Sequence, residues 1–180
     1  MSQRFANGVF LAQNKSIFEV VMIASSGYSA SVNITRPADT TAYTAGDVVG
    51  AATAALSFAN IGPTAVGQIL ITSVQLEIDV TAVPSGMTSF RLHLYNVTPP
   101  SAYADNAVWD LASGDRASYL GYVDLGSPVD LGSTLYVRND GVNAQFTPLS
   151  TSIFGYLVTN GAFTPAASTV MKITLHSAAL

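Results

Sequence analysis

The sequence predicts an all-β protein, an antiparallel β-sandwich of the eight-stranded jelly-roll type with an N-terminal arm. Apolar and polar residues alternate in a series of short segments, which is the period of strands with one dry and one wet face. Turn-forming Gly, Pro, Asp and Asn residues separate these segments, and almost no stretch has a helical period. Short strands of this kind build sandwiches or barrels, and long connections among them favour a jelly roll over an up-and-down barrel.

The best-specified segment runs from Val66 to Val97. Its alternation is complete from Ser73 to Val80, and it resumes from Phe90 to Tyr95 after the Pro84-Ser85-Gly86 turn. A hairpin would bury the apolar residues of both strands together and oppose polar residues on the wet face. Its register would be Val80–Phe90, Ile78–Leu92 and Leu76–Leu94, with Asp79 opposite Arg91 and Glu77 opposite His93. In a jelly roll, consecutive strands often lie in opposite sheets, and the same turn would instead carry the chain across.

Residues 1–30 are predicted to form an N-terminal arm or edge segment, and residues 31–180 a single sandwich domain. Before Gly27 the apolar residues follow neither the strand period nor the helix period for long. Two interpretations stay open: an edge strand with an irregular lead-in, or an apolar arm that packs on a neighbouring subunit. The second rests on three phenylalanines, Phe5, Phe10 and Phe18.

The segments that follow begin with a short strand at Val32 and Ile34. Arg36-Pro37 ends this strand, because proline donates no ladder hydrogen bond and restrains the residue before it. Residues 37–46 are rich in turn-forming residues and are predicted to form a surface loop. Asp47–Ala59 is predicted to be a strand of small residues, with an amphipathic helix as the alternative, since alanine is a good helix former.

The second half of the chain carries five more predicted strands, Ser118–Leu125, Ser133–Asn139, Ala144–Leu149, Ser152–Asn160 and Ser168–Ser177. Gly121 and Gly155 lie inside two of them and indicate bulges or close backbone approaches. The two histidines, His93 and His176, occupy outward strand positions, so both are expected on the surface.

The stretch Thr98–Ala117 is too long for a bare turn, and loops beyond about 12–15 residues tend to be functional. It carries the only tryptophan, Trp109. This residue either anchors the loop on the sandwich or on a partner, which is favoured, or forms a sugar-stacking platform with Tyr103 and Tyr119. Turn and capping roles are favoured over a calcium site for the loop's carboxylates, because no EF-hand pattern is present. These carboxylates are Asp105, Asp110 and Asp115.

The amino-acid composition favours association with other protein and argues against nucleic-acid binding and a membrane span. Charged residues make up 10% of the 180 residues and hydrophobic residues 49%, whereas roughly a quarter of a typical soluble domain is charged. A surface with so few charges favours association with other protein. The net charge of −4 and the scattered basic residues argue against nucleic-acid binding. No apolar stretch approaches the roughly 20 residues of a membrane span.

The sequence contains no recognisable catalytic pattern. Cysteine is absent, and neither a nucleophile elbow nor a phosphate-binding loop is present. No carboxylate is placed in a way that suggests a glycosidase pair. We therefore expect a protein that is not an enzyme and that needs no cofactor or metal.

Three stretches of the chain resemble small structural proteins of tailed bacteriophages, the head decoration or cement proteins. The stretches are ITRPADTTAYTAGDVVG from Ile34, LHLYNVTPPSAYADNAVWDLASGDRASYLGYVDLGSPVDLGSTLY from Leu92, and SIFGYLVTNGAFTP with the terminal ITLHSAAL. The resemblance covers roughly Ile34 to Leu180. It implies a jelly-roll protein made in the host cytoplasm, a homotrimer in the virion that sits on the outer surface of the head and clamps neighbouring major capsid protein subunits.

The expected contact surface with the capsid consists of the apolar arm and two loops. Its candidate residues are Phe5, Phe10, Phe18, Arg36, Asp39, Tyr43, Tyr103, Trp109 and Asp110. The alternative function is a phage tail-fibre or receptor-binding module that recognises host glycan. For that function, Trp109 beside Asp105 and Asn106 is the candidate site.

Overall fold

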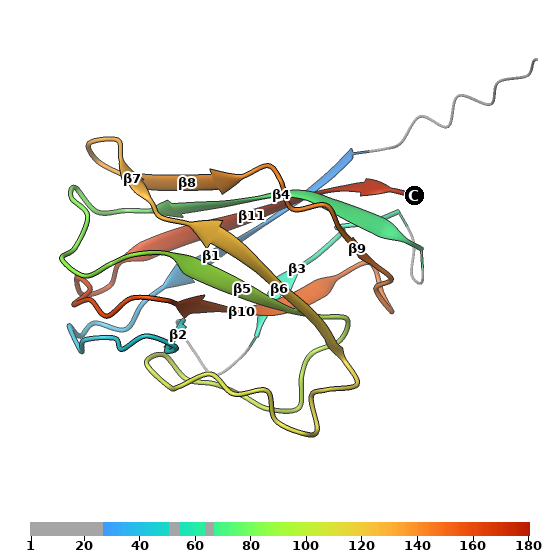
Figure 1. The fold of residues 1–180 in the computed structure, drawn as a ribbon, viewed down its shortest axis with the longest axis horizontal. Coiled ribbons are helices and arrows are strands. Elements are labelled where there is room, and N and C mark those ends of the chain that lie inside the picture. Colours follow the sequence, from blue (N-terminus) through green and yellow to red (C-terminus); the bar gives the residue numbers. More distant parts are fainter. Residues whose placement is uncertain (1–26, 51–54, 64–66) are drawn as a thin grey trace, which may run out of the picture.

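The computed structural model describes residues 27–50, 55–63 and 67–180, and Figure 1 shows their arrangement. The described residues form strands and no helix. The strands are β1 (Gly27–Thr35), β2 (Val48–Val49), β3 (Leu56–Phe58), β4 (Ile69–Ile78), β5 (Phe90–Tyr95), β6 (Tyr119–Gly126), β7 (Val129–Asp130), β8 (Leu135–Asn139), β9 (Ala144–Phe146), β10 (Ile153–Thr159) and β11 (Val170–Ala179). No helix in this part of the chain is long and apolar enough to cross a membrane.

The strands build two antiparallel sheets that face each other (Figure 1). One sheet has the order β1-β11-β4-β8-β7, with β9 also paired to β4, and the other has the order β2-β10-β5-β6, with β3 also paired to β10. β2 and β3 share the position beside β10, and β8 and β9 share the position beside β4. If β7 is counted as an extension of the edge, the two sheets therefore have eight principal strand positions. This is the jelly-roll arrangement. The predicted fold class is confirmed.

The predicted hairpin between Ser73–Val80 and Phe90–Tyr95 is wrong. β4 pairs with β11, β8 and β9 in one sheet, and β5 pairs with β10 and β6 in the other. The connection between β4 and β5 crosses from sheet to sheet, so the apolar faces of the two strands meet across the core. Two charged residues that the hairpin would have paired with each other's strand form different ion pairs. Arg91 Nε lies 2.8 Å from Asp124 Oδ1, and Lys172 Nζ lies 3.7 Å from Glu77 Oε1.

The core lies between the sheets and is built from the alternating apolar residues of the strands. β4 and β11 bury almost every inward side chain, and β10 is buried along most of its length. The fully buried apolar residues include Phe58, Ile69, Ile71, Val74, Leu76, Phe90, Leu92, Leu94, Ile153, Leu157, Ile173 and Leu175. This core holds the connecting loops at the two ends of the sandwich.

Both strand glycines have the predicted backbone roles. A Cβ atom on Gly155 would lie 2.7 Å from the backbone oxygen of His93 in the neighbouring strand. Gly121 has a φ of +110° and lies where the register between β5 and β6 shifts, which is a β-bulge. The close approach and the bulge are therefore confirmed.

The N-terminal boundary differs in detail from the prediction. β1 begins at Gly27 and ends at Thr35, just before Arg36-Pro37. The last four residues of the predicted 1–30 segment thus belong to the first strand. Residues 1–26, with Phe5, Phe10 and Phe18, lie outside the described residues.

Candidate functional site

Two loops contain the candidate contact residues that the structure describes. The 36–47 loop connects β1 to β2 and carries Arg36, Asp39 and Tyr43. The 96–118 loop connects β5 to β6 and carries Tyr103, Trp109 and Asp110. The two loops lie against each other, so residues distant in the sequence form one surface.

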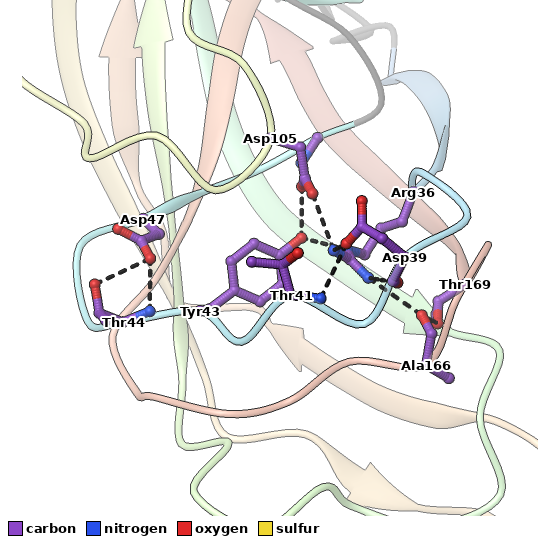
Figure 2. Close-up of polar contacts among 10 residues, drawn as sticks. Arg36, Asp39, Thr41, Tyr43, Thr44, Asp47, Asp105, Ala166 and Thr169 are labelled. Atoms are coloured by element: carbon purple, nitrogen blue, oxygen red, sulfur yellow. Dashed lines mark hydrogen bonds and ion pairs between the residues drawn. The ribbon is translucent and has the colours of Figure 1, made fainter.

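A buried polar network joins the two loops, and Figure 2 shows its members. The Arg36 guanidinium donates to Asp105 Oδ2 at 2.9 Å, and the Tyr43 hydroxyl donates to Asp105 Oδ1 at 2.5 Å. Arg36 Nε also donates to the Tyr43 hydroxyl oxygen. The Arg36 side chain is 0% exposed and that of Asp105 is 9% exposed. A buried ion pair of this geometry contributes only when further hydrogen bonds satisfy both partners.

Further contacts satisfy the remaining groups of this network. Asp105 Oδ1 also accepts the backbone N–H of Gly50 at 2.9 Å, and Arg36 donates to the Ala166 backbone oxygen at 3.2 Å. Burial, together with the hydrogen bond to the Asp105 carboxylate, raises the pKa of Tyr43 well above its usual range. Tyr43 therefore stays a neutral hydrogen-bond donor around neutral pH.

Short-range turn contacts shape the 36–47 loop. The Asp39 side chain accepts the backbone N–H of Thr41 at 3.0 Å, and the Asp47 side chain accepts both the backbone N–H and the hydroxyl of Thr44 (Figure 2). The Asp39–Thr41 contact is an Asx turn, which is a common use of aspartate in loops. This contact with Thr41 holds the exposed Asp39 side chain within its own loop. Arg36 Nη2 lies 3.7 Å from Asp39 Oδ1.

Backbone hydrogen bonds fasten the 96–118 loop onto its neighbour. Trp109 N–H donates to the Gly46 oxygen at 2.9 Å, and Val48 N–H donates to the Ala107 oxygen at 2.8 Å. Asp47 and Val108 form an isolated antiparallel bridge. The outer part of the long loop thus behaves as a short extra strand segment beside the start of β2.

Trp109 anchors the long loop on the outer face of β5. Its ring stacks on His93 with centroids 3.5 Å apart and an interplanar angle of 24°, and its Nε1 donates to the Tyr95 hydroxyl at 3.3 Å. One ring face of Trp109 is therefore occupied within the protein. This geometry supports the anchoring interpretation over a sugar-stacking platform.

His93 is not on the surface, and that prediction is wrong. The outward positions of β5 are covered by the 96–118 loop, so His93 is 4% exposed and Tyr95 is fully buried. Burial first, and the nearby Arg91 charge second, lower the pKa of His93 to about 4. Its Nδ1 lies 2.9 Å from the Tyr119 hydroxyl. His176 is partly exposed, as expected for an outward strand position.

Tyr103 and Asp110 belong to the same loop but face different surroundings. The Tyr103 hydroxyl donates to the backbone oxygen of Asp110, and the Tyr103 ring packs edge-on against Tyr156 at 5.2 Å. Asp110 itself is exposed. Tyr103 therefore stabilises the loop from inside, whereas Asp110 is available to a partner.

The three loop carboxylates do not converge. Asp105 is engaged by Arg36 and Tyr43, and Asp115 is buried with its Oδ1 accepting the Ser101 N–H at 3.1 Å. In the described part of the chain, no group of three acidic or histidine side chains could hold a metal ion. Asp105 thus belongs to a buried ion pair between the loops and Asp115 to a contact within its own loop, so the predicted turn and capping roles do not describe Asp105.

Burial changes the role expected for two candidate residues. Arg36 and Tyr43 are 2% and 1% exposed, so they hold the loops together and offer no contact area to a partner. Val108, which was not a candidate, is 68% exposed on the outside of the long loop. Its neighbour Trp109 points inward, and adjacent residues of an extended segment point to opposite sides. That alternation is the signal that could have identified Val108.

No family model matches the sequence, and no curated protein matches it significantly. Chains of similar fold occur in solved phage capsids. A chain in the capsid of Ralstonia phage GP4 is 9% identical with a TM-score of 0.41, and the match covers 87% of this chain and 84% of that one. A chain of the Helicobacter pylori bacteriophage KHP30 capsid is 10% identical with a TM-score of 0.30, covering 86% and 90%. A cyanophage Pam1 capsid chain is 13% identical with a TM-score of 0.31, covering 86% and 84%.

Proposed function

We propose that this chain is a structural, non-enzymatic protein of a phage virion. In this proposal it binds the outer surface of the head and holds neighbouring major capsid protein subunits together. The observation that carries the proposal is the preorganised surface formed by the 36–47 and 96–118 loops. The resemblance of Ile34–Gly50 and Leu92–Tyr136 to head decoration proteins supports the same assignment.

Preorganisation of the loops favours a docking role. The Arg36–Asp105 pair is buried between the two loops and holds them together. Loops that are already rigid lose less conformational freedom on binding, which strengthens association without new contacts. The outward side chains of the rigid surface, Val108, Asp110 and Asp39, are then available to a partner.

Exposed apolar side chains also favour a docking role. Nine large apolar side chains in the described residues are between 37% and 68% exposed. They are Val83, Val97, Val108, Tyr122, Val129, Leu131, Leu149, Val170 and Leu180. Of these, Val108 lies on the surface formed by the two loops, where its exposed apolar side chain suits burial against another protein.

The mechanism that follows is stabilisation by mass action. A protein that binds only the closed shell lowers the free energy of that state by RT ln(1 + [L]/Kd) and so opposes its disassembly. A homotrimer at a lattice position with threefold or quasi-threefold symmetry would engage several capsid subunits at once. Weak individual contacts then combine through effective concentration.

The test is cosedimentation with heads of the encoding phage that lack this protein. We expect the wild-type chain to bind them and to raise their temperature of disruption. Val108→Glu should weaken binding at least tenfold, because it places a charge at the centre of the proposed contact. Leu131→Glu is the matched control, since Leu131 is 66% exposed on the turn after β7 and should bind normally.

Both variants should unfold at the wild-type temperature, since neither side chain is buried. A chain that ignores the heads would refute the proposed function. Normal head binding by Val108→Glu would refute the assignment of the contact to the long loop.

A further inference from the structure

Strand β1 has one edge that no other described strand covers. It forms one border of its sheet, and among the described residues it pairs with β11 alone. Just past its end, the Arg36 N–H donates to the Thr169 oxygen. Because the backbone groups of an antiparallel strand point to alternate sides, the even-numbered residues of β1 bond to β11 and the odd-numbered residues direct their N–H and C=O groups outward. The outward residues are Gly27, Ser29, Ser31, Asn33 and Thr35, and all of them are exposed.

The other strands at the borders of the two sheets are short or bulged. β2, β3, β7 and β9 have two or three residues each. β6 has eight residues, but its register with β5 shifts twice. Short length, bulges, charges and prolines are the devices by which proteins keep edge strands from pairing with other chains. β1 has none of them: Gly27–Thr35 is nine residues in an unbroken register, without a charge or a proline.

The absence of charge on this edge favours a second copy of the same strand as its partner. The chain has a net charge of −4, so two copies repel each other wherever their carboxylates would meet. An antiparallel pair of β1 strands related by a twofold axis brings no like charges opposite each other. A strand that carried charges would gain no ion pair from this edge.

A twofold axis centred on Ser31 overlaps the whole strand. Ser31 then lies opposite the same residue of the second copy, and Ser29 lies opposite Asn33. Gly27 and Thr35 form the outermost pairs. In each of these pairs the outward N–H and C=O groups of both residues exchange hydrogen bonds. The serine and asparagine side chains can also bond across the axis, because each of them both donates and accepts.

The same register extends the apolar face of the sheet. Val32 lies opposite Ala30 of the second copy, and Tyr28 lies opposite Ile34. Ala30 and Ile34 are buried within one copy, whereas Tyr28 and Val32 are only partly buried. Pairing therefore covers apolar surface that a single copy leaves open to water, and it does so in the register that satisfies the backbone.

We propose that two copies of this chain associate by antiparallel pairing of their β1 strands, centred on Ser31. The pairing joins their two β1-containing sheets into one continuous sheet, which is strand addition at an exposed edge. This contact is twofold, so it is additional to the homotrimer contacts of the proposed function. It does not rest on the capsid role, and its tests use the purified chain without heads.

Disulfide trapping tests the pairing and its register, because the chain contains no cysteine. In the proposed register the two Ser31 Cα atoms are about 5.5 Å apart, which is within the range of disulfides. The two Ser29 Cα atoms are roughly 14 Å apart, since four residues of strand separate them. Under mild oxidation, Ser31→Cys should therefore form disulfide-linked dimers at least tenfold faster than Ser29→Cys. Equal rates in the two variants would overturn the proposal.

A mixture of two variants checks the register independently. Ser29→Cys and Asn33→Cys chains should crosslink to each other at least tenfold faster than either variant crosslinks to itself, because the register places Ser29 opposite Asn33. A mixture that links no faster than its components would show that the strands do not pair in this way.

Sedimentation of the full chain over a concentration series measures the association itself. The twofold contact predicts an associated species with an even number of copies. Ser31→Lys places two like charges at the axis and should raise the dissociation constant at least tenfold. Ser31→Ala loses the same hydroxyl contact with Thr174 without adding a charge, and it should associate like wild type. Gln145→Lys, which adds the charge at an exposed position of β9, should also associate normally.

The sedimentation result has three outcomes that contradict the pairing. They are a chain that stays monomeric, an assembly with an odd number of copies, and association of Ser31→Lys with the wild-type dissociation constant. Unfolding temperatures of Ser31→Lys and Ser31→Ala are compared with wild type to confirm that both variants fold, as expected for an exposed side chain.

Discussion

Arg36 and Asp105 show how a single pair of side chains sets the shape of a surface that neither of them reaches. Both are buried, and each lies in a different loop. Around them, the Tyr43 hydroxyl and the Gly50 N–H complete the hydrogen bonding of the carboxylate. Because the buried charges are fully partnered only in this arrangement, the two loops have one favourable relative position.

Removing the carboxylate should therefore be costly. We expect Asp105→Ala to lower the free energy of unfolding by about 3–5 kcal/mol, because it leaves the buried Arg36 guanidinium without its counter-ion. Urea denaturation at pH 7 measures the change. Asp140→Ala is the control, since the Arg138–Asp140 pair is exposed and such pairs contribute at most about 1 kcal/mol. Equal losses in the two variants would contradict the structural role of the buried pair.

His93 is the residue through which this protein should respond to acid. Its folded-state pKa is lowered from 6.5 to about 4, first by burial and then by the Arg91 charge. The unfolded chain therefore binds a proton that the folded chain refuses between about pH 6.5 and pH 4. Stability from this residue is complete above pH 6.5 and is lost as the pH falls through that window.

The loss should reach about 3 kcal/mol by pH 4, since each unit of pKa shift corresponds to about 1.4 kcal/mol. Urea denaturation from pH 7 to pH 4 should give a steeper decline for wild type than for His93→Phe, in which the titrating group is gone. An NMR titration should place the His93 midpoint near pH 4. A midpoint near the ordinary histidine value, or identical pH profiles for the two proteins, would rule this account out.

At the scale of elements, β10 illustrates how closely the strands of the second sheet approach. A Cβ on Gly155 would lie 2.7 Å from the His93 oxygen and 3.3 Å from Leu92 Cδ1. Gly155→Ala should destabilise the protein by about 1–3 kcal/mol, because the added methyl forces β5 and β10 apart. Thermal unfolding measures this effect. Gly114→Ala, whose Cβ would meet nothing within 4 Å, should change stability far less, and an equal drop would refute the close-approach argument.

The elements also show which features of the chain were predictable. The alternation of β4 and β11 correctly placed their apolar side chains in the core, although Ser73 and Thr174 on the opposite faces are buried as well, and Arg36-Pro37 correctly ended the first strand. The same alternation failed for β5, whose outward residues His93 and Tyr95 are buried. A period of two identifies which residues share a face, but it does not reveal that a loop 14 residues further on will cover that face with Trp109.

The candidate site was predictable only in its location. The length and composition of Thr98–Ala117 predicted a functional loop with Trp109 as its anchor. The roles of Arg36 and Tyr43 were not visible, because a charged residue beside a proline in a polar loop is ordinarily solvated. Their burial depends on Asp105, a residue distant in the sequence, which no local pattern connects to them.

At the scale of the whole molecule, the two sheets supply the core, and the 36–47 and 96–118 loops supply the surface proposed for binding. Most of the described cations are neutralised within the chain: Arg36, Arg91, Arg138 and Lys172 all lie within 4 Å of a carboxylate. The described part has ten Asp or Glu residues and five Lys or Arg residues, so its net charge is negative and carboxylates remain in excess over these pairs.

The sequence by itself determined that this chain is an antiparallel β-sandwich, which faces of its strands are dry, and where proline and glycine end or bend them. These are local properties, set by side-chain period and backbone restraint. Only the tertiary structure decided that β4 and β5 lie in opposite sheets, that the Arg36 and His93 side chains are buried, and that Val108 is exposed. Strand pairing and loop packing are non-local, because each strand's dry face is equally compatible with several neighbours until the whole core is assembled.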